Sequence, residues 1–164
     1  MKKILLLSDT HSYLDEKIKK YLDTCDEVWH AGDIGNAALY EELEKIKPLI
    51  AVYGNIDGAD VRKFCNKNER FFCEKVDVWI THIGGYPGNY SSLIRNEIIS
   101  NPPKLFICGH SHILKVMFDK KLNLLHMNPG ACGNHGFHRV KTLLRFTINE
   151  DAIGNLEVIE LGLK

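Results

Sequence analysis

The sequence predicts an α/β fold, with α+β character in its second half, in which two mixed β-sheets pack face to face and are flanked by helices. Two observations support this prediction. In the first half, apolar runs alternate with amphipathic segments, which is the pattern of parallel strands joined by helical crossovers. In the second half, most apolar runs are short and typical of strands. This pattern favours four layers, with helices outside a pair of sheets.

Length and composition are those of an ordinary globular protein. The 164 residues are 45% hydrophobic and 26% charged, which suits one domain over residues 1–164 with a sizeable core. Lys plus Arg (21) equals Asp plus Glu (21), so the formal net charge is zero. The balance gives no strong signal for nucleic-acid or membrane binding.

The N-terminal segment and the cysteines indicate a compartment. The apolar run at residues 4–7 stops at Ser8, well short of the roughly 7–15 residues of a secretory signal. No segment approaches the roughly 20 apolar residues of a membrane span. The five cysteines form no C-x-x-C pair, so neither a disulfide framework nor a zinc knuckle is indicated. We expect a reduced, cytoplasmic protein.

The first half is expected to run strand, helix, strand, helix, strand. A continuous aliphatic run at the N-terminus is typical of a strand buried on both faces. Asn36 can cap the second helix, and Pro48 follows its end. The expected strands cover residues 3–8, 27–30 and 49–53, and the expected helices cover residues 14–22 and 37–46.

The second half is expected to contain one helix among strands. The helix covers residues 90–99, with Leu93, Ile94, Glu97 and Ile98 on one buried face. Trp29 and Trp79 fall within expected strands and are predicted to be core residues. A turn is expected at residues 128–130. The expected strands are residues 70–74, 76–81, 105–108, 113–118, 122–127, 141–148 and 156–161.

Two histidines, His110 and His112, follow directly after an apolar run. Side chains two apart on an extended backbone project to the same side, so we expect both imidazoles to face one point. The same spacing occurs earlier, at Asp9 and His11. Such pairs are expected at a metal or catalytic centre.

Asp, Asn or His residues follow five successive predicted strands. Since the carboxyl ends of parallel strands share one edge of a sheet, we expect these side chains to converge there. Several of them adjoin glycines, which suits loops that approach a centre closely. The set consists of Asp9, His11, Asp33, Asn55, His82, His110 and His112.

Carboxylate, amide and imidazole ligands without a thiolate favour divalent transition metals. We expect Mn²⁺, with Ni²⁺, Fe²⁺ or Zn²⁺ as alternatives. Seven ligands exceed what one such ion takes from a protein, whereas two ions that share a carboxylate would use all of them. Centres with two ions are a recurring solution for phosphoryl chemistry.

The order of these motifs resembles the calcineurin-like metallophosphoesterase superfamily, and most closely its small phosphodiesterases of the YfcE type. The resemblance covers the chain as far as residue 130 and implies the four-layer α/β/β/α sandwich of that superfamily. It is carried by Asp9-x-His11, Gly32-Asp33, Gly54-Asn55, His82 with a nearby glycine, and Gly109-His110-Ser111-His112.

The resemblance implies a metal-dependent phosphodiesterase that hydrolyses a small soluble diester by attack of a metal-bridging hydroxide. A phosphomonoesterase or a nuclease for short oligonucleotides is one alternative. A non-catalytic interaction scaffold, like the retromer subunit with this fold, is another, and a homodimer is possible. The implied ligands are Asp9, His11, Asp33 and His112 for one ion, and Asn55, His82, His110 and the bridging Asp33 for the other.

The sequence departs from larger members of the superfamily after Asn55. Those members have a His that assists the leaving group, whereas Ile56 stands here and cannot transfer a proton. We expect His135 or His138 to supply the proton and Arg139 to pair with a phosphate oxygen.

Other polar and aromatic residues leave alternatives open. His30 and His126 are expected to be structural, although His30 could also support the metal ligands. Asp57 could cap the segment after it or orient Asn55. Tyr86, Tyr90 and Phe137 are candidates for lining a substrate pocket, and Cys132 is expected to be a packing residue.

Overall fold

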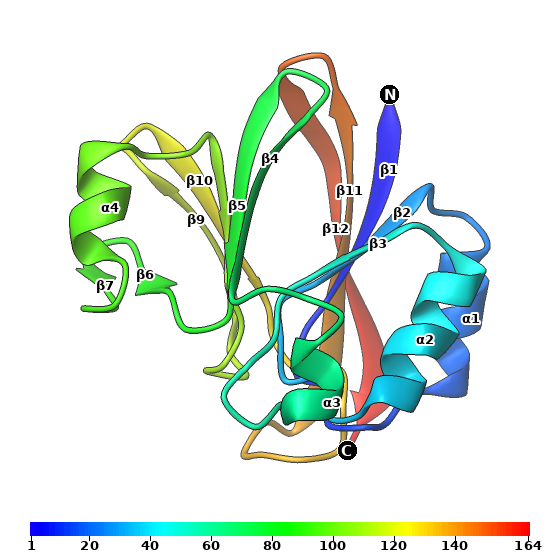
Figure 1. Cartoon of the computed structure of the whole chain (residues 1–164). Helices are drawn as coiled ribbons and strands as arrows, with labels where there is room; N and C mark the ends of the chain where they lie inside the picture. Colours follow the sequence, from blue (N-terminus) through cyan, green and yellow to red (C-terminus); the bar gives the residue numbers. More distant parts are fainter.

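The computed structural model describes residues 1–164 and shows two five-stranded sheets, which confirms the predicted fold class (Figure 1). The first sheet has the order β12-β11-β1-β2-β3. Its strands β1, β2 and β3 are parallel, as the alternation of strands and helices predicts, and β11 and β12 extend the sheet in antiparallel fashion. The bounds are β1 (Lys2–Leu7), β2 (Glu27–His30), β3 (Leu49–Ala51), β11 (Val140–Asn149) and β12 (Ala152–Leu163).

The second sheet has the order β4-β5-β8-β10-β9. Its three central strands are parallel, and its two edge strands pair with them in antiparallel fashion. A two-stranded hairpin, β6 (Gly85–Tyr86) and β7 (Asn89–Tyr90), lies between β5 and α4 and was not expected from the sequence. The remaining bounds are β4 (Asn68–Cys73), β5 (Val76–Thr81), β8 (Leu105–Ile107), β9 (Leu114–Asp119) and β10 (Leu124–Pro129).

Alternation along the buried strands produces the layers. On β1, Leu5 and Leu7 pack with the helices that cover the first sheet, whereas Ile4 and Leu6 pack between the two sheets. On β8, Phe106 faces the helix that covers the second sheet. Trp29 and Trp79 are both buried, as expected.

The helices are shorter than the sequence predicts, with one exception. That exception is α2 (Ala37–Ile46), where the Asn36 side chain accepts a hydrogen bond from the Leu39 N–H at 2.9 Å. Residues 14–22 form a 3₁₀ turn, η1 (Glu16–Ile18), followed by α1 (Lys19–Leu22), because Asp15 caps the chain only at that point. No helix has the length and apolar character needed to span a membrane.

One expected helix and one expected turn are corrected, and one helix was not expected. Tyr90 belongs to β7, so α4 (Arg95–Ser100) begins five residues late and leaves Leu93 61% exposed instead of buried. A short helix that was not expected, α3 (Ala59–Arg62), follows the third strand. The expected turn at residues 128–130 is also wrong in part, because β10 continues through Pro129.

Candidate metal centre

Five loops meet where parallel strands of both sheets end, in the lower part of the molecule in Figure 1. The loops after β1, β2 and β3 come from the first sheet, and the loops after β5 and β8 come from the second. The expectation of one edge of a single sheet is therefore wrong, because the two sheets contribute their ends across the packed interface. These loops still bring together all the expected ligands: Asp9, His11, Asp33, Asn55, His82, His110 and His112.

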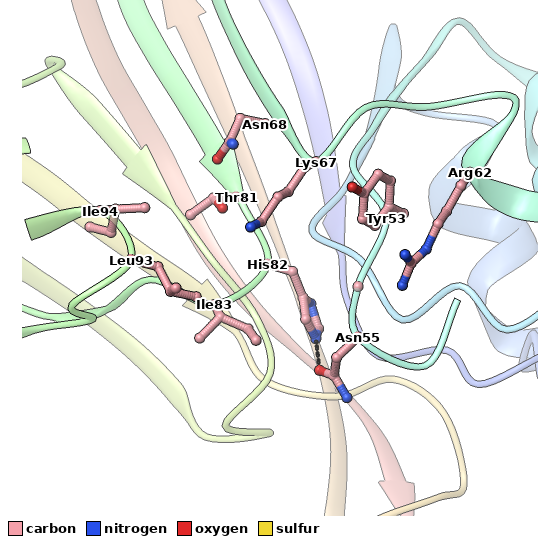
Figure 2. Close-up of a pocket in the computed structure, with 11 residues that line it drawn as sticks. Tyr53, Asn55, Arg62, Lys67, Asn68, Thr81, His82, Ile83, Leu93 and Ile94 are labelled. Atoms are coloured by element: carbon pink, nitrogen blue, oxygen red, sulfur yellow. Dashed lines mark hydrogen bonds between the residues drawn. The ribbon is translucent and has the colours of Figure 1, made fainter. Parts of the chain in front are cut away.

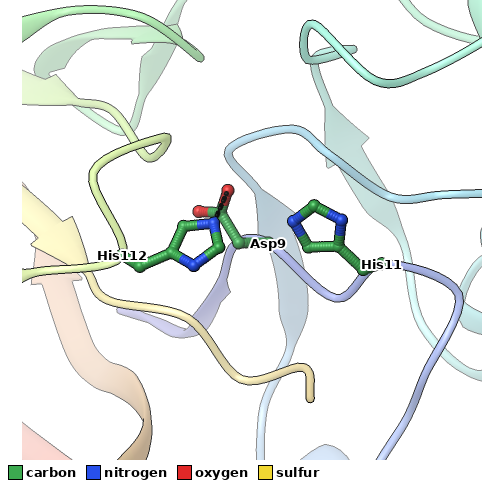
Figure 3. Close-up of side chains that lie close together, drawn as sticks. All are labelled: Asp9, His11 and His112. Atoms are coloured by element: carbon green, nitrogen blue, oxygen red, sulfur yellow. Dashed lines mark ion pairs between the residues drawn. The ribbon is translucent and has the colours of Figure 1, made fainter. Parts of the chain in front are cut away.

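The Asp9 carboxylate is completely buried, and its two oxygens have different environments. Oδ2 accepts hydrogen bonds from the Ser8 hydroxyl at 2.6 Å and from the His110 N–H at 3.1 Å. Oδ1 has no hydrogen-bond partner and lies 3.1 Å from Nε2 of His112 (Figure 3). One oxygen is thus held in place while the other remains available to a ligand.

His11 completes the first group of donors. Its Nε2 is also buried without a hydrogen-bond partner, and the donor atoms of Asp9, His11 and His112 lie within 4.8 Å of one another. Burial lowers the pKa of His11 despite the nearby carboxylates of Asp33 and Asp9, which favours the neutral imidazole that a metal requires. Unpartnered buried atoms of this kind are costly unless a cation satisfies them, so these residues fit a metal ion.

Asp33 lies between the two groups of donors. Its Oδ2 lies 3.7 Å from Nε2 of His11, and its Oδ1 lies 3.2 Å from Nε2 of His82. Burial alone would raise the pKa of Asp33, but hydrogen bonding and charge from His82, together with the Ile56 N–H, hold this pKa below its usual range. An ionised carboxylate with one oxygen toward each group can bridge two ions.

The second group contains His82, Asn55 and His110. His82 Nδ1 lies 2.7 Å from the Ala31 carbonyl, which can only accept, so Nδ1 carries the proton and Nε2 faces Asn55 and Asp33. The Asn55 Oδ1 atom lies 3.1 Å from His82 Nε2 and 2.9 Å from His110 Nδ1. The dashed line in Figure 2 marks the first of these contacts.

The ionisation of the two imidazoles in the second group differs. Burial would lower the pKa of His82, but Asp33 and Asp9 outweigh it and raise this pKa. Burial, followed by the neighbouring charge of His82, lowers the pKa of His110. Donor atoms of Asp9, Asp33 and His82 also lie within 4.8 Å of one another, so Asp9 is within reach of both groups.

The backbone at the ligands is left-handed instead of extended. Residues Asp9, His11, Asp33, His110 and His112 have φ values between 47° and 68°. The expected two-residue alternation after the strand ends is therefore wrong, because β8 stops at Ile107 and a tight turn carries both histidines. The turn directs His110 to Asn55 and His112 to Asp9. Non-glycine residues adopt this conformation rarely, and such residues cluster at functional sites.

Asp57 joins the loops that carry Asp33 and Asn55. Its buried carboxylate accepts backbone N–H hydrogen bonds from Gly35 at 2.7 Å, Gly54 at 2.8 Å and Ile34 at 3.1 Å. It therefore orients Asn55 through the backbone and does not cap the following helix. In the sequence, Asp57 stands two residues after Asn55, and this spacing alone could not show these partners.

Asn128 supports the turn that carries the two histidines, and sequence reasoning missed this role. Its side-chain NH₂ donates to the Gly109 carbonyl at 2.9 Å and to the Ser111 hydroxyl at 3.1 Å. Gly109 itself packs so closely on Ser8 and Asp9 that a Cβ atom would overlap them. Gly54 packs equally closely on Asp33, so both glycines serve close approach, as expected.

The loop at residues 133–139 covers one side of the centre. His135 lines a cavity of about 250 Å³ together with His11, Asp33 and His110, and its ring lies 4.8 Å from that of His11. His138 lies outside this lining, donates from Nε2 to the Gly133 carbonyl at 2.9 Å and packs against His112. Burial lowers the pKa of His138. Arg139 does not line the cavity, whereas Phe137 does.

The other expected structural residues are buried. His30 accepts from the Gly32 N–H at 3.1 Å and donates to the Thr10 hydroxyl at 2.9 Å, while burial lowers its pKa to about 4. It therefore supports the loops that carry the ligands. Cys132 is buried in the core beside β1, and all five cysteines are unpaired.

Comparison with known proteins identifies the family. Residues 1–151 match the calcineurin-like phosphoesterase superfamily domain, and the chain belongs to this superfamily. No curated protein matches the sequence significantly.

Solved structures of three kinds of protein share the fold. An archaeal phosphodiesterase is 22% identical, with a TM-score of 0.72 and coverage of 97% of this chain and 99% of its own. A predicted phosphoesterase from Streptococcus pneumoniae is 20% identical, with a TM-score of 0.70 and coverage of 97% and 89%. Vps29 from Entamoeba histolytica, complexed with Zn²⁺, is 15% identical, with a TM-score of 0.74 and coverage of 97% and 98%.

Proposed function

We propose that this protein is a phosphodiesterase that uses two divalent metal ions to hydrolyse a small soluble phosphodiester. The observation that carries the proposal is the position of Asp33, whose two oxygens face two separate groups of donors. The unpartnered Asp9 Oδ1 and His11 Nε2 atoms beside it support a cation at this place.

Each group of donors would hold one ion. Asp9, His11 and His112 would bind the first ion, Asn55, His82 and His110 the second, and Asp33 both. The absence of thiolates favours Mn²⁺, with Ni²⁺, Fe²⁺ or Zn²⁺ as alternatives. When bound, two such ions would supply Lewis-acid chemistry, which activates water and neutralises phosphate oxygens.

The residues of the chain supply the remaining steps. Asp9 and Asp33 accept hydrogen bonds from the backbone N–H groups of His110 and Ile56, which holds the loops that carry the ligands. The site therefore needs little rearrangement when charge develops on the phosphoryl group. Water adds to phosphorus, one ester P–O bond breaks, and the departing oxygen takes a proton, which gives a phosphomonoester and an alcohol. His135 lines the cavity and is our candidate for the proton donor. His138 would hold this loop, and the phosphate contact of Arg139 stays a prediction from the sequence.

The cavities around the centre favour a diester over a monoester. The cavity of about 250 Å³ that His11, Asp33 and His135 line is called the metal cleft. A cavity of about 270 Å³ shares Asn55 with this metal cleft and is also lined by Arg62 and Lys67 (Figure 2). A second cavity, of about 410 Å³, shares His110 and Ser111 with the cleft. A phosphodiester has two ester groups, and each of these cavities can accept one. A cytoplasmic location and a homodimer stay predictions from the sequence.

The test combines metal analysis with hydrolysis. We expect about two ions per chain after reconstitution with Mn²⁺, and faster cleavage of bis(p-nitrophenyl) phosphate than of p-nitrophenyl phosphate. Asp33→Ala should lose both ions and reduce the rate by about 10³-fold. Asp60→Ala, which alters an exposed carboxylate nearby, serves as the control.

Two results would overturn the proposal in different ways. If Asp33→Ala kept one tightly bound ion and full turnover, the bridging role would be wrong. If the wild-type protein bound no Mn²⁺, Ni²⁺, Fe²⁺ or Zn²⁺ and cleaved neither ester, an interaction scaffold would be favoured. The structural similarity to Vps29 makes the scaffold the second candidate, and because a Vps29 structure also contains Zn²⁺, hydrolysis and not metal binding alone separates the two.

A further inference from the structure

The second cavity lies beside the metal cleft, between the β6–β7 hairpin, the start of α4 and the ends of β9 and β10. Gly109, His110 and Ser111 line it and connect it to the cleft that contains the proposed metal ligands. Its volume of about 410 Å³ suits a small organic group, not a polymer. Any group placed here would lie next to His110.

The cavity is lined by two cations and by no carboxylate. Lys115 and Arg95 both contribute to the lining, and neither forms an ion pair with Asp or Glu. The Lys115 ammonium lies over the Tyr86 ring, 3.9 Å from its centroid. Arg95 is held by hydrogen bonds from Nε and Nη2 to the Tyr90 carbonyl, at 3.3 and 2.9 Å. Unpaired cations held in place by neutral groups favour an anionic ligand.

His126 provides an independent indication of a ligand. The residue is only 1% exposed, lines the cavity, and has an Nδ1 atom without any hydrogen-bond partner. Burial, together with the charge of Lys115, lowers its pKa to about 4, so the imidazole is neutral at physiological pH. A buried polar atom of this kind is normally satisfied by a partner, and a bound polar group would supply one.

The sheet places these side chains together. In the antiparallel pairing of β10 with β9, Asn128 lies opposite Lys115 and His126 lies opposite Met117. Residues two apart on each strand share a face, so Lys115, His126 and Asn128 all project toward α4. The same Asn128 supports the turn that carries His110. The cavity is therefore coupled to the metal cleft through the strand and the turn.

We propose that this cavity binds one ester group of the substrate and selects phosphodiesters in which that group carries a second anion, such as a phosphate. This inference rests on the phosphodiesterase function proposed above and specifies its substrate class. Lys115 and Arg95 would contact the second anion. His126 Nδ1 would form one hydrogen bond with a polar atom of the same ester group.

A matched pair of substrates tests the proposal. The p-nitrophenyl ester of thymidine 5′-phosphate and the same compound with an added 3′-phosphate release the same chromophore and differ only in the second anion. With the Mn²⁺-loaded protein, we expect kcat/KM to be about 10-fold higher for the compound with the 3′-phosphate. Lys115→Gln should remove most of this preference through KM and change kcat/KM for the simpler ester less than about twofold.

Two further variants separate the effect of positive charge inside the cavity from the effect of the protein's net charge and from the geometry of Arg95. Lys120→Gln removes the same charge from the exposed β9–β10 turn, so it should keep the full preference. Arg95→Lys keeps the positive charge but loses the paired contact with Tyr90, so it should reduce the preference only in part. Equal loss in Lys115→Gln and Lys120→Gln would show a general charge effect and overturn the proposal.

The outcomes distinguish this inference from the proposed function. If the wild-type protein cleaves both esters with equal kcat/KM, the anion-selective cavity is wrong and the phosphodiesterase function stands. If neither ester is cleaved, the phosphodiesterase function fails, and calorimetric titration with thymidine 3′,5′-bisphosphate tests the cavity directly. Binding that Lys115→Gln does not weaken relative to Lys120→Gln would then refute the cavity as well.

Discussion

Replacing Asp57 tests whether a residue that binds no metal organises the centre. Its carboxylate accepts three backbone N–H hydrogen bonds, from Ile34, Gly35 and Gly54, and the side chain is 2% exposed. Hydrogen bonds to a charged group contribute about 1.5–3 kcal/mol each, and unsatisfied buried donors cost about as much. Because the three bonds share one carboxylate and are not additive, we expect Asp57→Ala to lower the free energy of unfolding by about 3–5 kcal/mol.

The conservative variant should cost less. In Asp57→Asn, the amide oxygen can replace Oδ2 and keep the bonds from Gly54 and Ile34, while its NH₂ group faces the Gly35 N–H. One lost bond and one unfavourable contact predict a loss of about 2 kcal/mol. In Asp57→Ala, by contrast, the Gly54 N–H also loses its acceptor, so looser placement of Asn55 should weaken the second metal site more than the first.

Urea unfolding of the metal-free protein, followed by circular dichroism, measures the stability, and metal titration measures the two sites. Asp60→Asn is the control, because Asp60 is exposed and accepts a single N–H from Ala37, so a change below about 0.5 kcal/mol is expected. A loss below 1 kcal/mol for Asp57→Ala, or equal weakening of both metal sites, would refute the reasoning.

Two further predictions concern the proton donor and a buried ion pair. His135→Ala should slow hydrolysis of diesters with poor leaving groups by about 10²-fold and affect p-nitrophenyl esters little. His138→Ala should lower the rates for both kinds of ester equally. Equal small effects of the two variants would contradict the role of His135. Asp15 accepts a hydrogen bond from Lys141 at 2.6 Å, which outweighs burial and lowers the pKa of Asp15 below its usual range. Because the pKa of Asp15 is lower in the folded state, the ionised carboxylate stabilises the folded protein at pH values above the unfolded-state pKa. This stabilisation is lost as the pH falls through the folded-state pKa. Asp15→Asn should therefore destabilise the protein by about 3 kcal/mol at pH 6 in urea unfolding, and by much less near pH 2; a difference that stays constant with pH would contradict this.

The layers of the fold could be predicted because their signals are local. The aliphatic run of β1 alternates between two buried faces, and this alternation is visible in Ile4, Leu5, Leu6 and Leu7 alone. The cap at Asn36 identified α2 for the same reason. The start of the helix expected at residues 90–99 was mispredicted, because Tyr90 donates a hydrogen bond to Asp119, 29 residues away, and is held in a strand.

The sequence by itself also determined the chemistry available to the site. The order and type of the polar residues at the strand ends predict donors for two metal ions, and the same motifs indicated the superfamily that the family match shows. Because Ile56 cannot transfer a proton, the sequence also predicts a proton donor from another part of the chain, and this stays a prediction.

Only the tertiary structure decided how these residues meet. The Asp9 carboxylate and the His110 N–H are 101 residues apart in the chain, and their contact depends on two sheets packing together. The division of Asp33 between two donor groups, the support from Asp57 and the cationic cavity around Lys115 follow from the same packing. Periodic patterns report which face of a strand is buried, but they carry no information about which distant loop lies opposite, and the site is made of those distant contacts.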